Sequence, residues 1–168
     1  MIDSKKSLEK YLQQKRFETA KKWIVGDVLD FGGNDGELKP LVTGEYTIVN
    51  YDHGPMVGKS FDTIVTLAVV EHIPVEDVYK IFESFKKQLR PNGKIILTTP
   101  TPRSKPILEA LASIHILDKQ NIEEHEHYWS QEELQNLATR SGLEIVHYEK
   151  FQLGCNQFAV MQHRSGEN

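Results

Sequence analysis

The stretch that decides the fold is residues 28–36, which read Val-Leu-Asp-Phe-Gly-Gly-Asn-Asp-Gly. An apolar run that ends beside an acid and passes into a glycine-rich turn predicts a buried strand followed by a tight connection to a helix. Glycines at such a turn let the backbone approach a ligand closely and expose its N–H groups. In an open α/β sheet this turn lies where the strand order reverses, which is where ligands bind. The stretch therefore indicates a ligand site, although a purely structural turn has the same pattern.

On both sides of this turn, segments with the apolar spacing of helices alternate with segments that have the pattern of strands. Helices are predicted at residues 4–24, 75–89, 104–116 and 130–141, and strands at 27–31, 46–50, 63–67, 94–99, 143–150 and 157–163. This alternation means an α/β fold with a mostly parallel sheet. Only residues 151–156 separate the last two strands, and a parallel crossover needs about a dozen residues or more. The last two strands should therefore form an antiparallel hairpin.

Composition narrows the class of protein. The 168 residues carry a net charge of −4, which argues against general affinity for nucleic-acid phosphate. The single cysteine, Cys155, excludes an intramolecular disulfide and suits a reducing compartment. No apolar run approaches the roughly 20 residues that span a bilayer. We expect a cytoplasmic protein with no membrane segment, built as one domain over residues 1–168, with an N-terminal helix over 1–25, an α/β core over 26–163 and a flexible tail over 164–168.

Four blocks, in order along the chain, resemble class I S-adenosylmethionine-dependent methyltransferases. The run Asp-x-Gly-x-Asn-x-Gly at 30–36 resembles motif I of that family, and residues 61–73 resemble its fourth-strand block, Phe-Asp and an apolar strand followed by Glu-His. Residues 89–97, Leu-Arg-Pro-Asn-Gly-Lys-Ile-Ile-Leu, resemble its turn into strand five, and 127–143 its late block. The resemblance is strongest to the small-molecule, type 11-like branch, which carries the Glu-His pair.

This resemblance implies a Rossmann-like methyltransferase fold with strand order 3-2-1-4-5-7-6 and strand seven antiparallel. Only residues 51–60 separate the second strand from the block at 61, where the family normally places a helix and a third strand. We therefore expect six strands in the order 2-1-4-5-7-6, in the family's numbering. Loss of the outer strand changes the sheet edge, and a homodimer through that edge is compatible with the sequence.

The resemblance also implies S-adenosylmethionine as the cofactor and places its site at the ends of three strands. Asp30 would help to hold the cationic methionine portion, unless it only stabilises the turn. Asn50 aligns with the ribose-binding acid, but Asp52 is preferred because a carboxylate accepts two hydroxyl protons. Arg16 could reach the cofactor carboxylate, although a solvent-exposed arginine is the favoured interpretation. The predicted cofactor-binding residues are Asp30, Gly32, Gly33, Asn34, Gly36, Asn50, Asp52, Leu67 and Ala68.

Histidines are the candidate catalytic residues. His72, in the Glu-His pair, could be a general base or a substrate ligand, and equally a residue that starts a helix. Residues 114–128, which contain His115, His125 and His127, correspond to the region that covers the acceptor in the family, and His127 is our candidate for a substrate-facing histidine. We expect no metal, because the spacing within residues 123–127 fits no strong zinc pattern and no cysteine lies near.

Taken together, the sequence predicts methyl transfer from S-adenosylmethionine to an oxygen, nitrogen or carbon nucleophile of a small molecule, with no nucleic-acid partner. The alternative is a catalytically inactive methyltransferase-like binding module, because Asn34 replaces the middle glycine of motif I and the third strand is missing. A nicotinamide-dependent enzyme is disfavoured, since its G-x-G-x-x-G fingerprint is not met at residues 32–37.

Overall fold

Six strands form one sheet in the order β2-β1-β3-β4-β6-β5 in the computed structural model, which describes residues 4–51, 58–113 and 124–166. Neighbours from β2 to β4 pair in parallel, whereas β6 is antiparallel to both β4 and β5. The strands are β1 (Val28–Phe31), β2 (Tyr46–Val49), β3 (Phe61–Leu67), β4 (Leu89–Pro100), β5 (Leu143–Phe151) and β6 (Asn156–His163). The predicted Rossmann-like order and the antiparallel hairpin are confirmed. No strand lies between β2 and β3 among the described residues.

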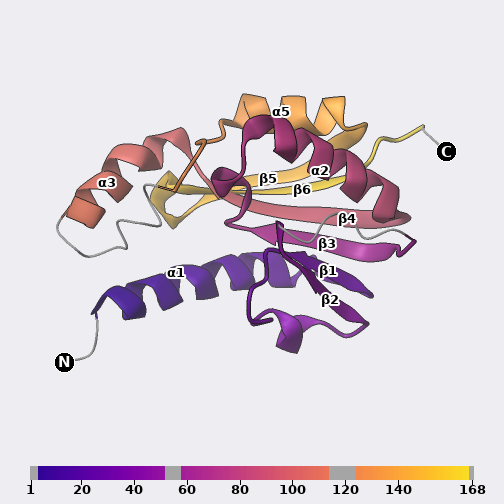
Figure 1. The fold of residues 1–168 in the computed structure, drawn as a ribbon, viewed down its shortest axis with the longest axis horizontal. Coiled ribbons are helices and arrows are strands. Elements are labelled where there is room, and N and C mark those ends of the chain that lie inside the picture. Colours follow the sequence, from indigo (N-terminus) through magenta and orange to yellow (C-terminus); the bar gives the residue numbers. More distant parts are fainter. Residues whose placement is uncertain (1–3, 52–57, 114–123, 167–168) are drawn as a thin grey trace.

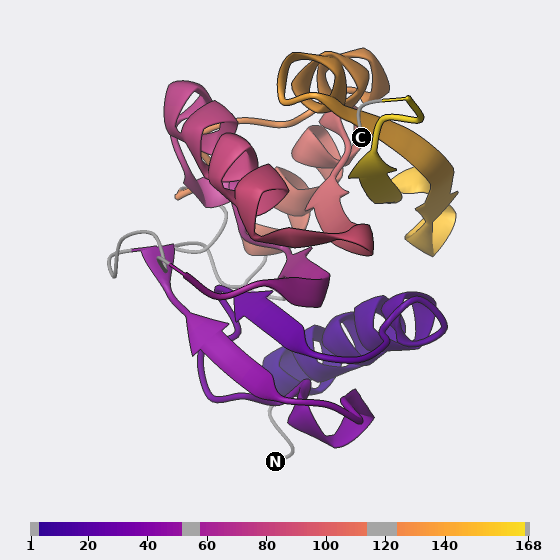
Figure 2. The same cartoon turned by 90° about the vertical axis from the view of Figure 1, so that its right-hand side faces the viewer.

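Helices cover both faces of the sheet, so the molecule has three layers (Figures 1 and 2). Helices α2 and α5 lie on one face and α1 lies on the other, while α3 lies beyond one end of the sheet (Figure 1). The helices are α1 (Ser4–Lys21), α2 (Val75–Gln88), α3 (Lys105–Ser113) and α5 (Gln131–Arg140). Short 3-10 helices are η1 (Lys39–Leu41), η3 (Val70–His72), η4 (Pro102–Ser104) and η5 (Gln152–Gly154). None of the helices in the described part of the chain combines the length and apolarity that a membrane span needs.

Two apolar cores result from the alternation of side chains along the strands. In β4, Ile95 and Leu97 belong to the core beneath α2 and α5, whereas Ile96 between them belongs to the core beneath α1. This is the period of two that a pleated strand imposes. Both faces of the central strands are therefore covered, which explains why their sequences read as continuous apolar runs.

The N-terminal helix departs from its prediction. It ends at Lys21 rather than at residue 24, so Trp23 and Ile24 continue the apolar stripe from the connection that follows the helix. Tyr11, in the first half of α1, is 54% exposed, whereas Phe17, in its second half, packs against the core beneath α1. The helical spacing of apolar residues predicted the helix correctly, but the apolar face of its first turns extends past the edge of the sheet.

Three local features set the ends of neighbouring elements. The Pro-Asn-Gly segment at 91–93 lies within β4, as a bulge: Phe61 pairs with Leu89 but Thr63 pairs with Lys94. Ser104 belongs to η4 rather than to the helix predicted from residue 104, and its hydroxyl donates to the carbonyl of Thr101. Helix α5 begins with a capping box, in which Ser130 and Glu133 form both reciprocal hydrogen bonds.

A charged cluster fixes the end of the sheet opposite the glycine turn. Arg90 forms ion pairs with Asp27 at 2.8 Å and with Asp62 at 2.5 Å. Asp62 also accepts the backbone N–H of Asp27 at 2.8 Å. These contacts hold the starts of β1, β3 and β4 together. Because the strands run in parallel from there, their carboxyl ends all open at the same edge.

Truncation of a core aromatic should cost far more stability than truncation of an exposed one. Phe82 of α2 is fully buried, so Phe82→Ala removes its packing and leaves a cavity; we expect a loss of about 3–5 kcal/mol in the free energy of unfolding. Tyr11→Ala, on the exposed face of α1, should change it by less than about 0.5 kcal/mol. Urea unfolding of both variants checks this, and similar losses for the two would contradict the layer arrangement.

Candidate functional site

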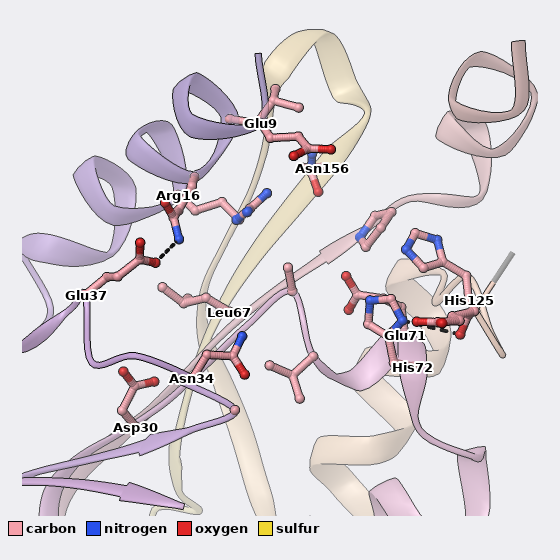
Figure 3. Close-up of a pocket in the computed structure, with 18 of the residues that line it drawn as sticks. Glu9, Arg16, Asp30, Asn34, Glu37, Leu67, Glu71, His72, His125 and Asn156 are labelled. Carbon is pink, nitrogen blue, oxygen red and sulfur yellow. Dashed lines mark hydrogen bonds between the residues drawn. The ribbon is translucent and has the colours of Figure 1, made fainter. Parts of the chain in front are cut away.

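A cavity of about 1100 Å³ opens at the carboxyl ends of β1, β2 and β3. Helix α1 forms one wall, the turn after β1 forms the floor, and residues 124–126 close the far end (Figure 3). Its volume is slightly larger than that of ordinary ligand pockets, which range over roughly 300–1000 Å³. The place is the one that the sequence predicted from the glycine turn.

The turn after β1 is built on the carboxylate of Asp30. A Cβ atom on Gly33 would lie 2.2 Å from Oδ2 of Asp30, so a side chain at this position would have to displace the carboxylate. The hydroxyl of Tyr46 in β2 donates a hydrogen bond of 2.5 Å to the same oxygen. Burial raises the pKa of Asp30, and the bond from Tyr46 opposes that rise. Asp30 therefore has a structural task in addition to lining the cavity.

Two further residues of the turn depend on backbone freedom. Gly32 has φ +82°, and a Cβ there would lie 2.5 Å from the side chain of Val69. Asn34, in place of the family's middle glycine, adopts φ 45°. Asparagine is among the side chains that tolerate this left-handed region, so the substitution is compatible with the turn. The turn forms despite the departure from motif I.

Of the other predicted cofactor residues that the structure describes, all but Gly36 line the cavity. Asn50 and Leu67 line it, and the side-chain oxygen of Asn50 is buried without a hydrogen-bond partner among the described residues. Ala68 also lines it with φ 57°, a strained conformation for alanine, and donates its N–H to the carbonyl of Thr98 at 2.9 Å. Gly36 packs near Ile48 of β2 instead. Asp52 lies outside the described residues.

Arg16 corrects the favoured interpretation of a solvent-exposed side chain. It is half-buried, and its guanidinium points into the cavity (Figure 3). Burial lowers its pKa, while the charge of Glu71 acts in the opposite direction. Within the described part of the chain it has no hydrogen bond or ion pair. The guanidinium is thus available to an anionic group in the cavity.

Three side chains meet at the far end of the cavity: Glu71, His72 and His125 (Figure 3). Glu71 is 1% exposed, accepts a hydrogen bond of 3.1 Å from the hydroxyl of Thr99, and burial raises its pKa to about 7. The rings of His72 and His125 meet edge to face with centroids 4.7 Å apart. Burial, with a smaller contribution from His72, lowers the pKa of His125 to about 4.

The backbone of Glu71 also explains how this end is closed. Its carbonyl accepts the N–H groups of Glu126 at 2.7 Å and of His127 at 3.2 Å. These two hydrogen bonds to one carbonyl oxygen bring a segment more than 50 residues away in sequence against the end of β3.

His127, our candidate for a substrate-facing histidine, is placed elsewhere. Its Nε2 lies 2.8 Å from Glu133 of α5, and its ring packs against Trp129 with centroids 5.1 Å apart. It lines a separate cavity of about 460 Å³ rather than the large one. His125, two residues earlier, lines both cavities. His115 lies outside the described residues.

Sequence reasoning missed Tyr46 and His125 as members of the site. Tyr46 opens β2 and carries no motif signal; only the pairing of Asp30 with Ile48, two residues after Tyr46, brings the tyrosine hydroxyl to the carboxylate. His125 was grouped with His127, and only the bonds to the Glu71 carbonyl decide which of the two enters the cavity.

Comparison with known proteins gives the class. The family described as a methyltransferase domain (Methyltransf_23) matches residues 5–148, so the chain belongs to this family of methyltransferases. The predicted resemblance is thereby confirmed. No curated protein matches the sequence.

Several solved structures share the fold at low sequence identity. A magnesium protoporphyrin IX methyltransferase from Synechocystis PCC 6803 with bound SAH has a TM-score of 0.67 at 14% identity, covering 90% of this chain and 84% of its own. An O-methyltransferase family protein from Burkholderia thailandensis has a TM-score of 0.67 at 14% identity, with 93% and 57% coverage. CalO1, a methyltransferase in calicheamicin biosynthesis solved with SAH bound, has a TM-score of 0.66 at 14% identity, with 94% and 55% coverage. The chain thus spans little more than half the length of the last two proteins.

Removal of the tyrosine hydroxyl beneath the turn should destabilise the protein. Tyr46→Phe leaves a buried carboxylate oxygen without its donor, and we expect a loss of about 1–2 kcal/mol in the free energy of unfolding. Tyr51→Phe is the matched control, because the Tyr51 hydroxyl donates to Asp77 at an exposed site and its loss should matter less. Equal effects in thermal unfolding would mean that the Asp30–Tyr46 bond has no special part in holding the turn.

Proposed function

We propose that the protein transfers a methyl group from S-adenosylmethionine to a nucleophile on a small molecule. The observation that carries this proposal is one continuous cavity with the glycine turn at one end and Glu71, His72 and His125 at the other. A methyltransferase of this fold needs both a cofactor end and an acceptor end within reach of each other. The bound SAH in two of the similar structures supports the same cofactor here.

The residues of the cavity fit this cofactor chemically. Six carboxylates and only two basic side chains line it, and S-adenosylmethionine carries a sulfonium and an ammonium cation. The carboxylates are those of Glu9, Asp30, Glu37, Glu71, Glu124 and Glu126, and the basic residues are Lys10 and Arg16. An acidic cavity attracts a cationic ligand.

Particular groups would hold particular parts of the cofactor. The turn at 32–34 offers the close backbone approach for the methionine portion, and Arg16 is the cation available to its carboxylate. Asn50, directly after β2, carries an oxygen with no hydrogen-bond partner in the described part of the chain and would accept a ribose hydroxyl. Leu67 and Ala68 would contact the cofactor through their backbone. Asp52 remains a candidate ribose ligand from the sequence.

The acceptor would lie between the cofactor and the histidine pair. The cofactor supplies an already activated methyl group, so the protein's task is to align the nucleophile with the methyl carbon and the sulfur. Such positioning can contribute roughly 7–11 kcal/mol to catalysis in favourable cases. His72 and His125 are the polar groups that would contact the acceptor. The magnesium protoporphyrin and calicheamicin enzymes act on small molecules by their names, which supports a small acceptor.

Cofactor binding tests this proposal. Calorimetric titration of the purified chain with S-adenosylmethionine and S-adenosylhomocysteine should give one site for each. Arg16→Met keeps much of the length of the side chain but loses its charge, and we expect roughly tenfold to hundredfold weaker binding. Arg164→Met, the same change at an exposed arginine away from the cavity, should leave the affinity unchanged.

Two results would count against the proposal. The absence of binding of either ligand at millimolar concentration would remove the cofactor. Binding without methyl transfer to a broad panel of phenols, carboxylates and amines, followed with methyl-labelled cofactor, would instead favour the inactive binding module.

A further inference from the structure

Glu71, His72 and His125 each offer one ligand atom, and these atoms lie within 4.8 Å of one another. In the part of the chain that the structure describes, no other three histidine, cysteine or acidic side chains come together in this way. Two of them come from η3 and the third from the segment that the Glu71 carbonyl holds in place. The cluster is therefore fixed by the fold rather than by proximity in sequence.

Both histidine rings are already oriented by a second bond. Nδ1 of His72 lies 3.3 Å from the carbonyl oxygen of Glu124. A carbonyl can only accept, so Nδ1 carries the hydrogen and Nε2 keeps a free lone pair. Nδ1 of His125 lies 3.0 Å from the hydroxyl of Tyr128. Histidines that bind metals are held by such bonds from their other ring nitrogen.

The carboxylate of Glu71 is buried, and the charge of Arg16 acts on it without forming an ion pair. It is 1% exposed, and the hydroxyl of Thr99 bonds to one of its oxygens, Oε2. No lysine or arginine among the described residues forms an ion pair with it. A buried carboxylate without a paired charge is costly, and a bound cation would remove that cost.

We propose that Glu71, His72 and His125 form a binding site for a divalent transition-metal cation at the acceptor end of the cavity. Two imidazole nitrogens and one carboxylate oxygen form the ligand set found at open sites for zinc and non-haem iron, and also suit manganese. All three residues line the cavity, so the remaining coordination positions would face it. The sequence did not predict this site because its ligands lie 53 residues apart and follow no known spacing.

The cation site has a consequence for the acceptor, and this part rests on the proposed function. A cation in this position would bind and orient an oxygen of the acceptor. The favoured acceptors are therefore small molecules in which a hydroxyl or carboxylate can serve as a metal ligand.

Metal titration in the absence of cofactor tests the site. The untagged full chain, freed of metal with EDTA and dialysed, is titrated with Co²⁺ while visible absorption is followed, and with Zn²⁺ by calorimetry. We expect one equivalent of each, with cobalt absorption that reports nitrogen ligands. His72→Ala and His125→Ala should each weaken binding at least tenfold. His127→Ala is the matched control and should bind as the parent does, because His127 is held by Glu133 outside the cluster.

The outcomes separate this inference from the proposed function. No saturable binding, binding that both cluster variants leave unchanged, or binding lost in His127→Ala would each overturn it. Circular dichroism melting establishes that the variants are folded. His125 is half-buried in a loop, so we expect His125→Ala to keep the fold. Cofactor binding is titrated separately on the metal-free chain. Cofactor binding without metal binding removes only this site, and metal binding without cofactor binding removes only the proposed function.

Discussion

The site depends on one buried carboxylate, that of Asp30, which lies beneath the backbone at Gly33 and accepts the hydroxyl of Tyr46. Because this carboxylate occupies the space that a side chain at residue 33 would need, glycine lets the chain pass over it without displacing it. The passage directs the turn toward the ends of β2 and β3 and creates the floor of the cavity. The same contact ties β1 to its edge neighbour β2, which is the outer strand of the sheet on that side.

Two separate sets of contacts form the cavity, one at each end of the sheet. The ion pairs of Arg90 hold the starts of β1, β3 and β4 together at one end of the sheet. Because these strands are parallel, their carboxyl ends lie side by side at the other end. There the carbonyl of Glu71 holds residues 126 and 127 and so brings His125 opposite His72. The end of the cavity proposed to hold the cofactor is thus built from the turns that follow neighbouring strands, whereas the end proposed to hold the acceptor requires a contact between distant segments.

This difference explains what the sequence could predict. The strand order and the antiparallel hairpin follow from local patterns and from the length of connections, and the structure has both; the described residues also contain no strand between β2 and β3. The end of the cavity beside the glycine turn was also predictable, because Asp30, the turn and Ala68 lie in short motifs beside strands. The far end was not, because the choice between His125 and His127 depends on hydrogen bonds to a carbonyl that no pattern in the sequence reports. Arg16 was misjudged for a related reason: the periodicity of α1 does not show how far the helix projects past the sheet.

In the proposed function, the cavity holds S-adenosylmethionine between the glycine turn and the histidine pair. A crystal structure of the full chain grown with saturating S-adenosylhomocysteine is the decisive measurement. We expect the amino-acid portion of the ligand against residues 32–34, its carboxylate at Arg16, and its sulfur directed toward Glu71, His72 and His125. A ligand bound elsewhere, or a cavity that stays empty at saturation, would contradict it.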